Sequence, residues 1–517
     1  MERKNAWEKY QGAEDQSLVM NFAEDYRRFL SANKTERECV SYFIEKAEKA
    51  GFRDLEEVIA SGRQLSAGDK VYRQHMGKTL ALFIIGSQSL AQGMNILGAH
   101  IDSPRMDLKQ NPLYEDSDLA LLDTHYYGGV KKYQWVTLPL ALHGVIAKKD
   151  GSLVLVNIGE KPEDPVFGVS DLLIHLSARQ LEKPGAKVVE GEALDVLIAS
   201  RPLEDCDDQV KERVKANVLR ILADQYGVDE EDFLSAEIEV VPAGAARDYG
   251  VDRSMIMGYG HDDRVCAYPS FAAILASKAQ ERTQACLLVD KEEIGSVGAT
   301  GMQSLFFENT VAELIAATED YEEIKTKRAL MNSMALSSDV SAAFDPNYPD
   351  VMEKKNAAYF GRGLVINKYT GARGKSGSND ASAEYMAKIR RIFDDNEVYW
   401  QTAELGKVDQ GGGGTIAYIL GNYGMEVIDS DSQRWAMSQV KWPTPNPSGS
   451  SAVDLIHGPA ADLLWLAVNN LPFYIAIEPL LSFLKDTFCD AGLGSTMTSS
   501  LPLDWSWSRC TETGAFA

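Results

Sequence analysis

The sequence of 517 residues lacks several features that would assign it to a common class of protein. Its six cysteines form no Cys-X-X-Cys pair, which excludes a zinc knuckle and gives no pattern of a disulfide framework. Lysine and arginine number 52 against 76 acidic residues, and the net charge of −24 argues against nucleic-acid partners and anionic membranes, which need basic patches. The Gly-X-Ser-X-Gly, Walker and Gly-X-Gly-X-X-Gly motifs are all absent.

A signal-peptide pattern is also missing, because the first 16 residues are charged and polar. Together with the scattered cysteines, this predicts a reducing, cytoplasmic location. One stretch, Leu463 to Leu484, is apolar enough to resemble a membrane span. Asn469, Pro472 and Glu478 interrupt it, so we expect no span and no membrane partner.

The pattern of apolar residues predicts an α/β protein with an insertion. Strands alternate with helices before residue 112 and again after residue 251, which is typical of an α/β sandwich around a buried sheet. The clearest strands are expected at 79–85, 94–99, 285–289, 364–366 and 400–402, and the clearest helices at 41–51 and 264–279. Between 113 and 250 the pattern changes to short β-like runs, such as 135–142 and 152–158, with one helix near 210–227. We therefore expect a discontinuous domain (1–112 and 251–429), an inserted β-rich domain (113–250) and a tail (430–517).

Four short segments place acidic or imidazole groups at the ends of predicted strands, where side chains converge on a crevice. In the first, Asp102 lies two positions after His100, on the same side of a strand, and could fix the tautomer of a metal-bound imidazole. An Asx-type turn before Pro104 is the alternative interpretation. In the second, Asp262 precedes a predicted helix, where an acid either binds a cation or caps the helix.

The third segment contains two adjacent glutamates, Glu292 and Glu293, directly after a predicted buried strand. Two ionised carboxylates there need compensation such as a metal ion, and one could act as a base toward water; a solvated loop is the alternative. The fourth segment contributes one acid, Asp339. One histidine and several carboxylates suit a hydrolytic site with two metals about 3.5–4 Å apart, and zinc, manganese or cobalt fits such donors.

The four segments resemble those of the aspartyl aminopeptidase family of zinc peptidases, and its bacterial branch in particular. The similarity spans about residues 15 to 429 and rests on motifs in the family's order and spacing: His100-Ile-Asp-Ser-Pro104, Gly260-His-Asp-Asp-Arg-Val265, Asp290-Lys-Glu-Glu-Ile-Gly295 and Ser338-Asp-Val340. The resemblance implies the α/β sandwich of zinc peptidases, of the phosphorylase/hydrolase-like type, interrupted by a β-rich dimerisation domain. It also implies two zinc ions per chain and peptide substrates.

By the same resemblance, His100 and Asp339 serve different metals and Asp262 bridges them. Glu293 is a further ligand, and Glu292 is the general base. Manganese or cobalt remains an alternative to zinc.

The resemblance further implies that Asp102 orients the ligand histidine and that the chain forms a homo-oligomer, with dimers assembling into a tetrahedral dodecamer. His175 matches a family histidine that reaches a neighbouring subunit's active site and contacts substrate there. A lone histidine in an apolar run is equally compatible with a buried structural role.

Two departures from the family pattern bear on function. The run after Asp339 is Val-Ser-Ala-Ala-Phe344, without the histidine of many members, so neutral amino-terminal residues are compatible substrates. After Asp429, Ser438 stands where the family has its last metal-ligand histidine, and His457 is the only later histidine. We expect a frameshifted or fused tail that is poorly ordered.

The sequence therefore predicts a metal-dependent aminopeptidase that removes amino-terminal residues from peptides. Two alternatives remain open. The first is a catalytically impaired homologue acting as an oligomeric binding or scaffold protein, because Ser438 replaces a ligand. The second is another amidohydrolase with the same site, which turnover of amino-terminally blocked substrates would indicate.

Overall fold

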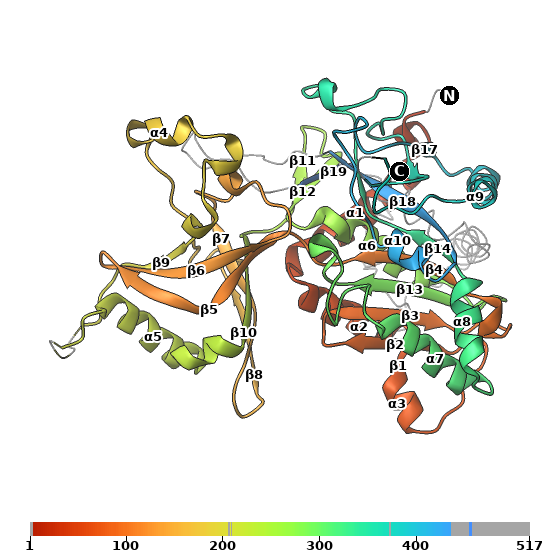
Figure 1. Ribbon diagram of the computed structural model, residues 1–517, viewed down its shortest axis with the longest axis horizontal. Helices are drawn as coiled ribbons and strands as arrows, with labels where there is room; N and C mark the ends of the chain where they lie inside the picture. The colour runs from red at the N-terminus through yellow and green to blue at the C-terminus, as the bar shows by residue number, and fades with distance from the viewer. Residues whose placement is uncertain (1–3, 205–206, 208, 372–373, 436–453, 458–517) are drawn as a thin grey trace, which may run out of the picture.

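A computed structural model describes residues 4–204, 207, 209–371, 374–435 and 454–457 of the chain (Figure 1). Two sheets are present in this part of the chain, one of 13 strands and one of six. They lie side by side, with the smaller sheet on the left of Figure 1 and the larger sheet, with most of the helices, on the right.

The large sheet runs in the spatial order β1 (Arg53–Asp54), β2 (Lys70–His75), β3 (Thr79–Ile84), β13 (Gln284–Val289), β4 (Asn95–His100), β14 (Met334–Ser337), β18 (Glu426–Trp435), β19 (Asp454–His457), β12 (Met255–Gly258) and β11 (Arg247–Tyr249). Three further strands belong to this sheet. β15 (Val340–Ala342) and β16 (Leu364–Asn367) pair with β18, and β17 (Trp400–Thr402) pairs with β16. The neighbours β13, β4, β14 and β18 are parallel, so their carboxyl ends meet on one side of the sheet.

Helices cover both faces of the large sheet, which explains why its strands are continuous apolar runs. Side chains alternate along β3: Leu80 and Leu82 pack in one core with α1 (Ala13–Ala32), α2 (Glu36–Lys49) and α6 (His261–Ala276). Ala81 and Phe83 pack in a second core with α3 (Leu55–Ala60), α7 (Phe306–Thr318), α8 (Glu323–Met331) and α10 (Ala417–Gly421). A further helix, α9 (Ala383–Asp395), packs against β14, β16 and β17. This three-layer arrangement confirms the predicted α/β sandwich.

The second sheet is entirely antiparallel and runs in the order β8 (Leu153–Ile158), β7 (Leu140–Ala147), β10 (Ala236–Pro242), β5 (Arg105–Asp116), β6 (Leu119–Tyr127) and β9 (Val196–Ala199). It has its own apolar core, which includes Val214 and Val218 of α5 (Arg213–Tyr226). The short helix α4 (Ala178–Leu181) and the 3-10 helix η4 (Ile174–Leu176) lie in the long connection between β8 and β9.

Two sequence expectations differ from the structure. The strand expected at 135–142 begins only at Leu140, because Thr137 has a positive φ of 60° and Pro139 has no N–H to donate. β18 continues past Asp429 to Trp435, so the large sheet includes residues that the sequence assigned to the tail. Ser438, the stretch Leu463 to Leu484 and nearly all of the expected tail lie outside the described residues. No helix in the described ranges is both long and apolar enough for a membrane crossing.

Candidate metal centre

The carboxyl ends of three adjacent parallel strands bring the predicted residues together. His100 is the last residue of β4, and Glu292 and Glu293 form the 3-10 helix η8 (Glu292–Ile294) just after β13. Asp339 lies in the loop between β14 and β15, and Asp262 lies at the start of α6. The edge of the sheet therefore collects four carboxylates around one imidazole.

Distances from the imidazole of His100 define the centre. Its Nε2 atom lies 3.1 Å from Asp262 Oδ1, 3.8 Å from Asp339 Oδ1 and 3.9 Å from Glu292 Oε2. The side chain of His100 is 1% exposed, whereas those of the three acids are 14–19% exposed. The histidine thus lies at the floor of the centre, and the carboxylates lie between it and solvent.

Two overlapping sets of side chains could each hold an ion. His100, Glu292 and Asp339 form one, and His100, Asp262 and Glu293 form the other; within each set the potential ligand atoms lie within 4.8 Å of one another. His100 and Asp339 belong to the same set. His100 also belongs to the second set, so the two sets share its imidazole.

Asp102 holds the opposite side of the imidazole. Its Oδ1 atom lies 3.2 Å from His100 Nδ1 and accepts a hydrogen bond of 3.2 Å from the backbone N–H of Glu292. Its Oδ2 atom accepts hydrogen bonds from the backbone N–H of Glu293 (3.3 Å) and the hydroxyl of Tyr127 (2.8 Å). Asp102 thus orients both the histidine and the backbone of the two glutamates, rather than serving only in an Asx turn.

The start of α6 contains no capping aspartate. Its N-cap is Gly260, without a side-chain cap, and Asp262 has non-helical backbone angles (φ −80°, ψ 107°) that turn it toward the imidazole. The hydroxyl of Ser103 donates to the Asp262 carbonyl at 2.6 Å. The neighbouring carboxylate of Asp263 is buried and accepts a hydrogen bond of 3.3 Å from the backbone N–H of His100.

Burial and mutual repulsion control the protonation of the acids. Burial, followed by the neighbouring carboxylates, raises the pKa of Glu292 to about 8 against the opposing effect of His100, and the same causes raise the pKa of Glu293 well above its usual value. Burial is also the main cause that raises the pKa of Asp339. Although burial disfavours the imidazolium, hydrogen bonds with Asp102, Asp262 and Asp339 raise the pKa of His100 well above its usual value. Such a cluster attracts cations strongly.

The donor set fits zinc. One imidazole and several carboxylates are ligands that zinc commonly takes, and the second nitrogen of the imidazole is held by a carboxylate, as in many zinc sites. The Oε1 atom of Glu293 is buried and makes no hydrogen bond within the described part of the chain, so it is available to a cation. These residues could therefore hold the metal that the sequence predicts.

His175 lies in the long connection between β8 and β9 of the second sheet, whereas the cluster lies at the edge of the large sheet. It belongs to η4, and it is exposed, so a buried structural role is wrong for this residue. Its neighbours Leu173, Ile174 and Leu176 are 69–70% exposed.

The sequence did not single out Tyr127 or Asp263. Asp263 is adjacent to Asp262 within one motif, and only the backbone geometry separates their contacts. Tyr127 ends β6 in the second sheet, where no local pattern distinguishes it from other strand tyrosines.

An α/β sandwich that gathers a histidine and four carboxylates from the ends of its parallel strands and the start of α6 is the arrangement of a metal-dependent hydrolase. The chain belongs to the aminopeptidase I zinc metalloprotease (M18) family, whose model matches residues 29–446. This match confirms the predicted family and the prediction of a zinc metalloaminopeptidase. Nothing in the comparisons supports a scaffold protein.

Individual relatives agree with this assignment. A probable M18 family aminopeptidase 1 of Clostridium acetobutylicum is 62% identical over 430 residues, which is 83% of this chain and 91% of the relative. The crystal structure of aminopeptidase I from the same organism has a TM-score of 0.82 at 55% identity and covers 91% of this chain and 100% of its own. An M18 aminopeptidase structure from Thermotoga maritima also has a TM-score of 0.82, at 40% identity, covering 90% and 98%.

Proposed function

We propose that the cluster around His100 is a two-zinc centre that hydrolyses the first peptide bond of peptide substrates. His100 and Asp339 would hold one ion and Glu293 the other, and Asp262 would contribute to both. The observation that carries this proposal is the convergence of these side chains at the ends of β4, β13 and β14. Manganese or cobalt would fit the same donors.

Bound zinc would supply a Lewis acid for the scissile carbonyl and lower the pKa of a water molecule. Glu292 then accepts the proton of the attacking water and transfers it to the leaving amine. Its carboxylate is suited to this role because it is 16% exposed and its Oε2 atom lies 3.9 Å from the imidazole of His100. Asp102 keeps the imidazole and the η8 backbone in place during the reaction.

Hydrolysis of matched peptides tests the proposal. Zinc-loaded protein is expected to cleave peptides with a free amino terminus and to leave their acetylated counterparts intact. Equal cleavage of both would instead indicate another amidohydrolase. A panel of first residues, acidic and neutral, would identify the preferred one, and the missing histidine after Asp339 favours neutral residues.

We also propose that the second sheet is a dimerisation domain and that the chain forms a homo-oligomer in the cytoplasm. An exposed apolar segment around η4 supports an interface, because Leu172, Leu173, Ile174 and Leu176 are 53–70% exposed. His175 lies within this segment, where it could enter a neighbouring subunit's active site and contact substrate. The three cysteines that the structure describes, Cys39, Cys266 and Cys286, are all buried thiols, which suits a reducing compartment.

A further inference from the structure

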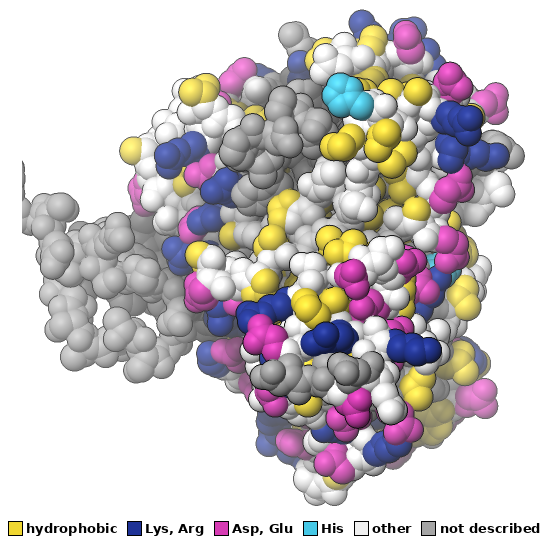
Figure 2. Space-filling model, turned by 90° about the vertical axis from the view of Figure 1, so that its left-hand side faces the viewer, with side chains coloured by type: hydrophobic (Ala, Val, Ile, Leu, Met, Phe, Trp, Pro, Cys, Tyr) yellow, Lys and Arg dark blue, Asp and Glu magenta, His cyan; other side chains and the backbone are white. Residues whose placement is uncertain are grey.

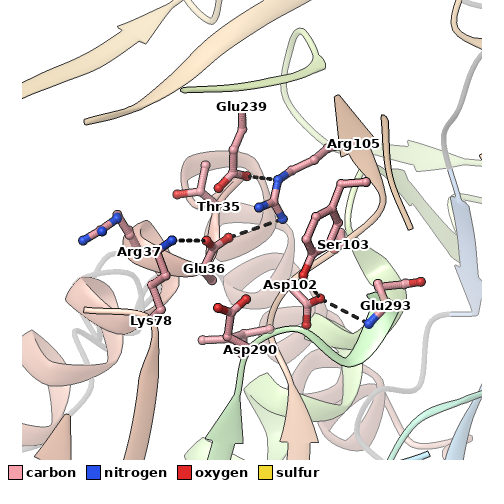
Figure 3. A network of polar contacts seen from close by, with 12 residues as sticks. Thr35, Glu36, Arg37, Lys78, Asp102, Ser103, Arg105, Glu239, Asp290 and Glu293 are labelled. Atoms are coloured by element: carbon pink, nitrogen blue, oxygen red, sulfur yellow. Dashed lines mark hydrogen bonds and ion pairs between the residues drawn. The ribbon is translucent and has the colours of Figure 1, made fainter. Parts of the chain in front are cut away.

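A buried ionic cluster lies where the second sheet meets the large one (Figure 3). Arg105 of β5 places Nε 3.1 Å from Glu239 Oε2 of β10, and a terminal guanidinium nitrogen 3.6 Å from Glu36 Oε2 of α2. All three residues are at most 6% exposed. The planar guanidinium therefore lies between Glu239 of the second sheet and Glu36 of α2, which packs on the large sheet.

The charges in this cluster compensate one another. Burial alone would raise the pKa of Glu36, but Arg105 and Lys78 hold it at about 2. Burial, with the adjacent charge of Glu36, raises the pKa of Glu239. Arg105 thus lies against two buried carboxyl groups, and its Nε also donates a hydrogen bond of 2.8 Å to Asp107 Oδ1, so three acidic side chains fix its position.

The fixed guanidinium connects to the metal centre through one aromatic ring. The central carbon of the Arg105 guanidinium lies 3.9 Å from the centroid of the Tyr127 ring, in cation–π geometry. Tyr127 is 8% exposed, and its hydroxyl donates the 2.8 Å hydrogen bond to Asp102 Oδ2. The path from the second sheet to His100 is thus continuous: guanidinium, ring, hydroxyl and carboxylate.

The hydrogen bonds of Asp102 show what the hydroxyl contributes. Oδ1 faces His100 and the backbone of Glu292, whereas Oδ2 receives only the Glu293 N–H and the Tyr127 hydroxyl. The Tyr127 bond is the shortest of these four. Without it, one oxygen of a buried carboxylate would keep a single donor, and the carboxylate plane that sets the imidazole orientation would be less constrained.

We propose that Tyr127 and Arg105 are positioning residues of the metal centre, through which the second sheet holds Asp102 and thereby the ligand His100. The inference rests on the proposed function, because it requires that His100 binds a metal ion. It assigns the second sheet a direct part in the geometry of the site, in addition to any part in assembly.

Cobalt binding to the full chain tests this inference. Tyr127→Phe removes one hydroxyl and keeps the ring that contacts Arg105, so the chelated variant should unfold at nearly the parent temperature. Co²⁺, followed by its visible absorption, should bind the variant about 10–100-fold more weakly, with an altered spectrum. At saturating metal, kcat should fall while KM stays within about twofold, because the hydroxyl does not contact substrate.

Tyr114→Phe is the matched control, since Tyr114 is also in the second sheet and its hydroxyl also donates to an aspartate, Asp195, at 2.5 Å. Its cobalt affinity and spectrum should equal those of the parent. If both variants bind cobalt equally weakly, or if Tyr127→Phe binds it as the parent does, the inference about Tyr127 is wrong while the proposed metal centre stands. A parent protein that binds no Co²⁺ would overturn the proposed metal centre and the inference together.

A double-mutant cycle tests whether Arg105 affects the metal centre through Tyr127. Arg105→Lys keeps the charge between Glu36 and Glu239 but loses the planar contact with the ring. If Arg105 acts through Tyr127, the double variant should bind Co²⁺ no more weakly than Tyr127→Phe alone. Additive losses would overturn the assignment of Arg105.

Discussion

His100 Nε2 lies 3.1 Å from Asp262 Oδ1, although 162 positions separate the two residues in the chain. β4 supplies the first and the start of α6 the second, and the loop after β14 adds Asp339 at 3.8 Å. A metal ligand set assembled from such distant segments exists only in the folded chain. Metal binding to this set would therefore be coupled to folding.

The two proposed ions should differ in affinity. In the proposed assignment the ion at Glu293 and Asp262 has only carboxylate ligands among the described residues, whereas the other ion has the imidazole of His100 together with Asp339. Calorimetric titration of chelated protein with zinc should resolve one tight and one weaker step, at least about tenfold apart. His100→Ala should abolish the tight step. Two equal steps in the parent protein would contradict this ligand assignment.

Replacement of the proposed base should separate metal binding from catalysis. Glu292→Gln keeps the size of the side chain but cannot accept a proton, so turnover should fall by about 10²–10⁴-fold with the zinc content unchanged. Glu57→Gln, at an exposed position on α3, is the control and should match the parent. Comparable turnover in both variants would remove Glu292 from the mechanism.

Zinc binding should release protons at pH 7. In the metal-free protein the pKa of Glu292 is raised to about 8, so this group carries a proton at pH 7, and the pKa values of Glu293 and His100 are also raised well above their usual values. Zinc favours their deprotonated forms, and the apparent affinity should therefore increase as pH rises through about 8. Titrations at pH 7 in buffers of different ionisation enthalpy measure the release. Equal heats in all buffers would show that no proton leaves.

Mixing two inactive variants should test whether His175 acts between subunits. His175→Ala subunits keep Glu292, and Glu292→Gln subunits keep His175. If His175 enters a neighbour's site, dissociating and reassembling the two variants together should restore part of the activity that each lacks alone. Leu181→Ala offers an exposed control position in the same connection that should leave activity intact. No recovery in verified mixed oligomers would place His175 outside the neighbouring site.

The sequence predicts the large sheet well because its physical signal is local. Continuous apolar runs such as Thr79–Ile84 and Gln284–Val289 need helices on both faces, and alternate residues of β3 do face two different cores. The sequence places the start of one strand at residue 135, but the strand begins at Leu140, because the apolar composition of this run conceals the turn at Thr137.

The sequence names the residues of the candidate site but does not predict the contacts between them. His100, Asp262, Glu292, Glu293 and Asp339 each occur in short segments at strand ends, which chemistry and position make recognisable. The pairing of His100 with Asp339 depends on the neighbouring, parallel placement of β4 and β14. The contact between Tyr127 and Asp102 depends on how two sheets meet, which no local pattern encodes.

The dependence of peptide hydrolysis on zinc tests the central claim most directly. Chelated protein should not cleave a peptide with a free amino terminus, and titrated zinc should restore cleavage to a plateau. His100→Ala should require far more zinc or remain inactive. Equal cleavage by chelated and zinc-loaded protein would contradict the assignment of the His100 cluster as the catalytic centre.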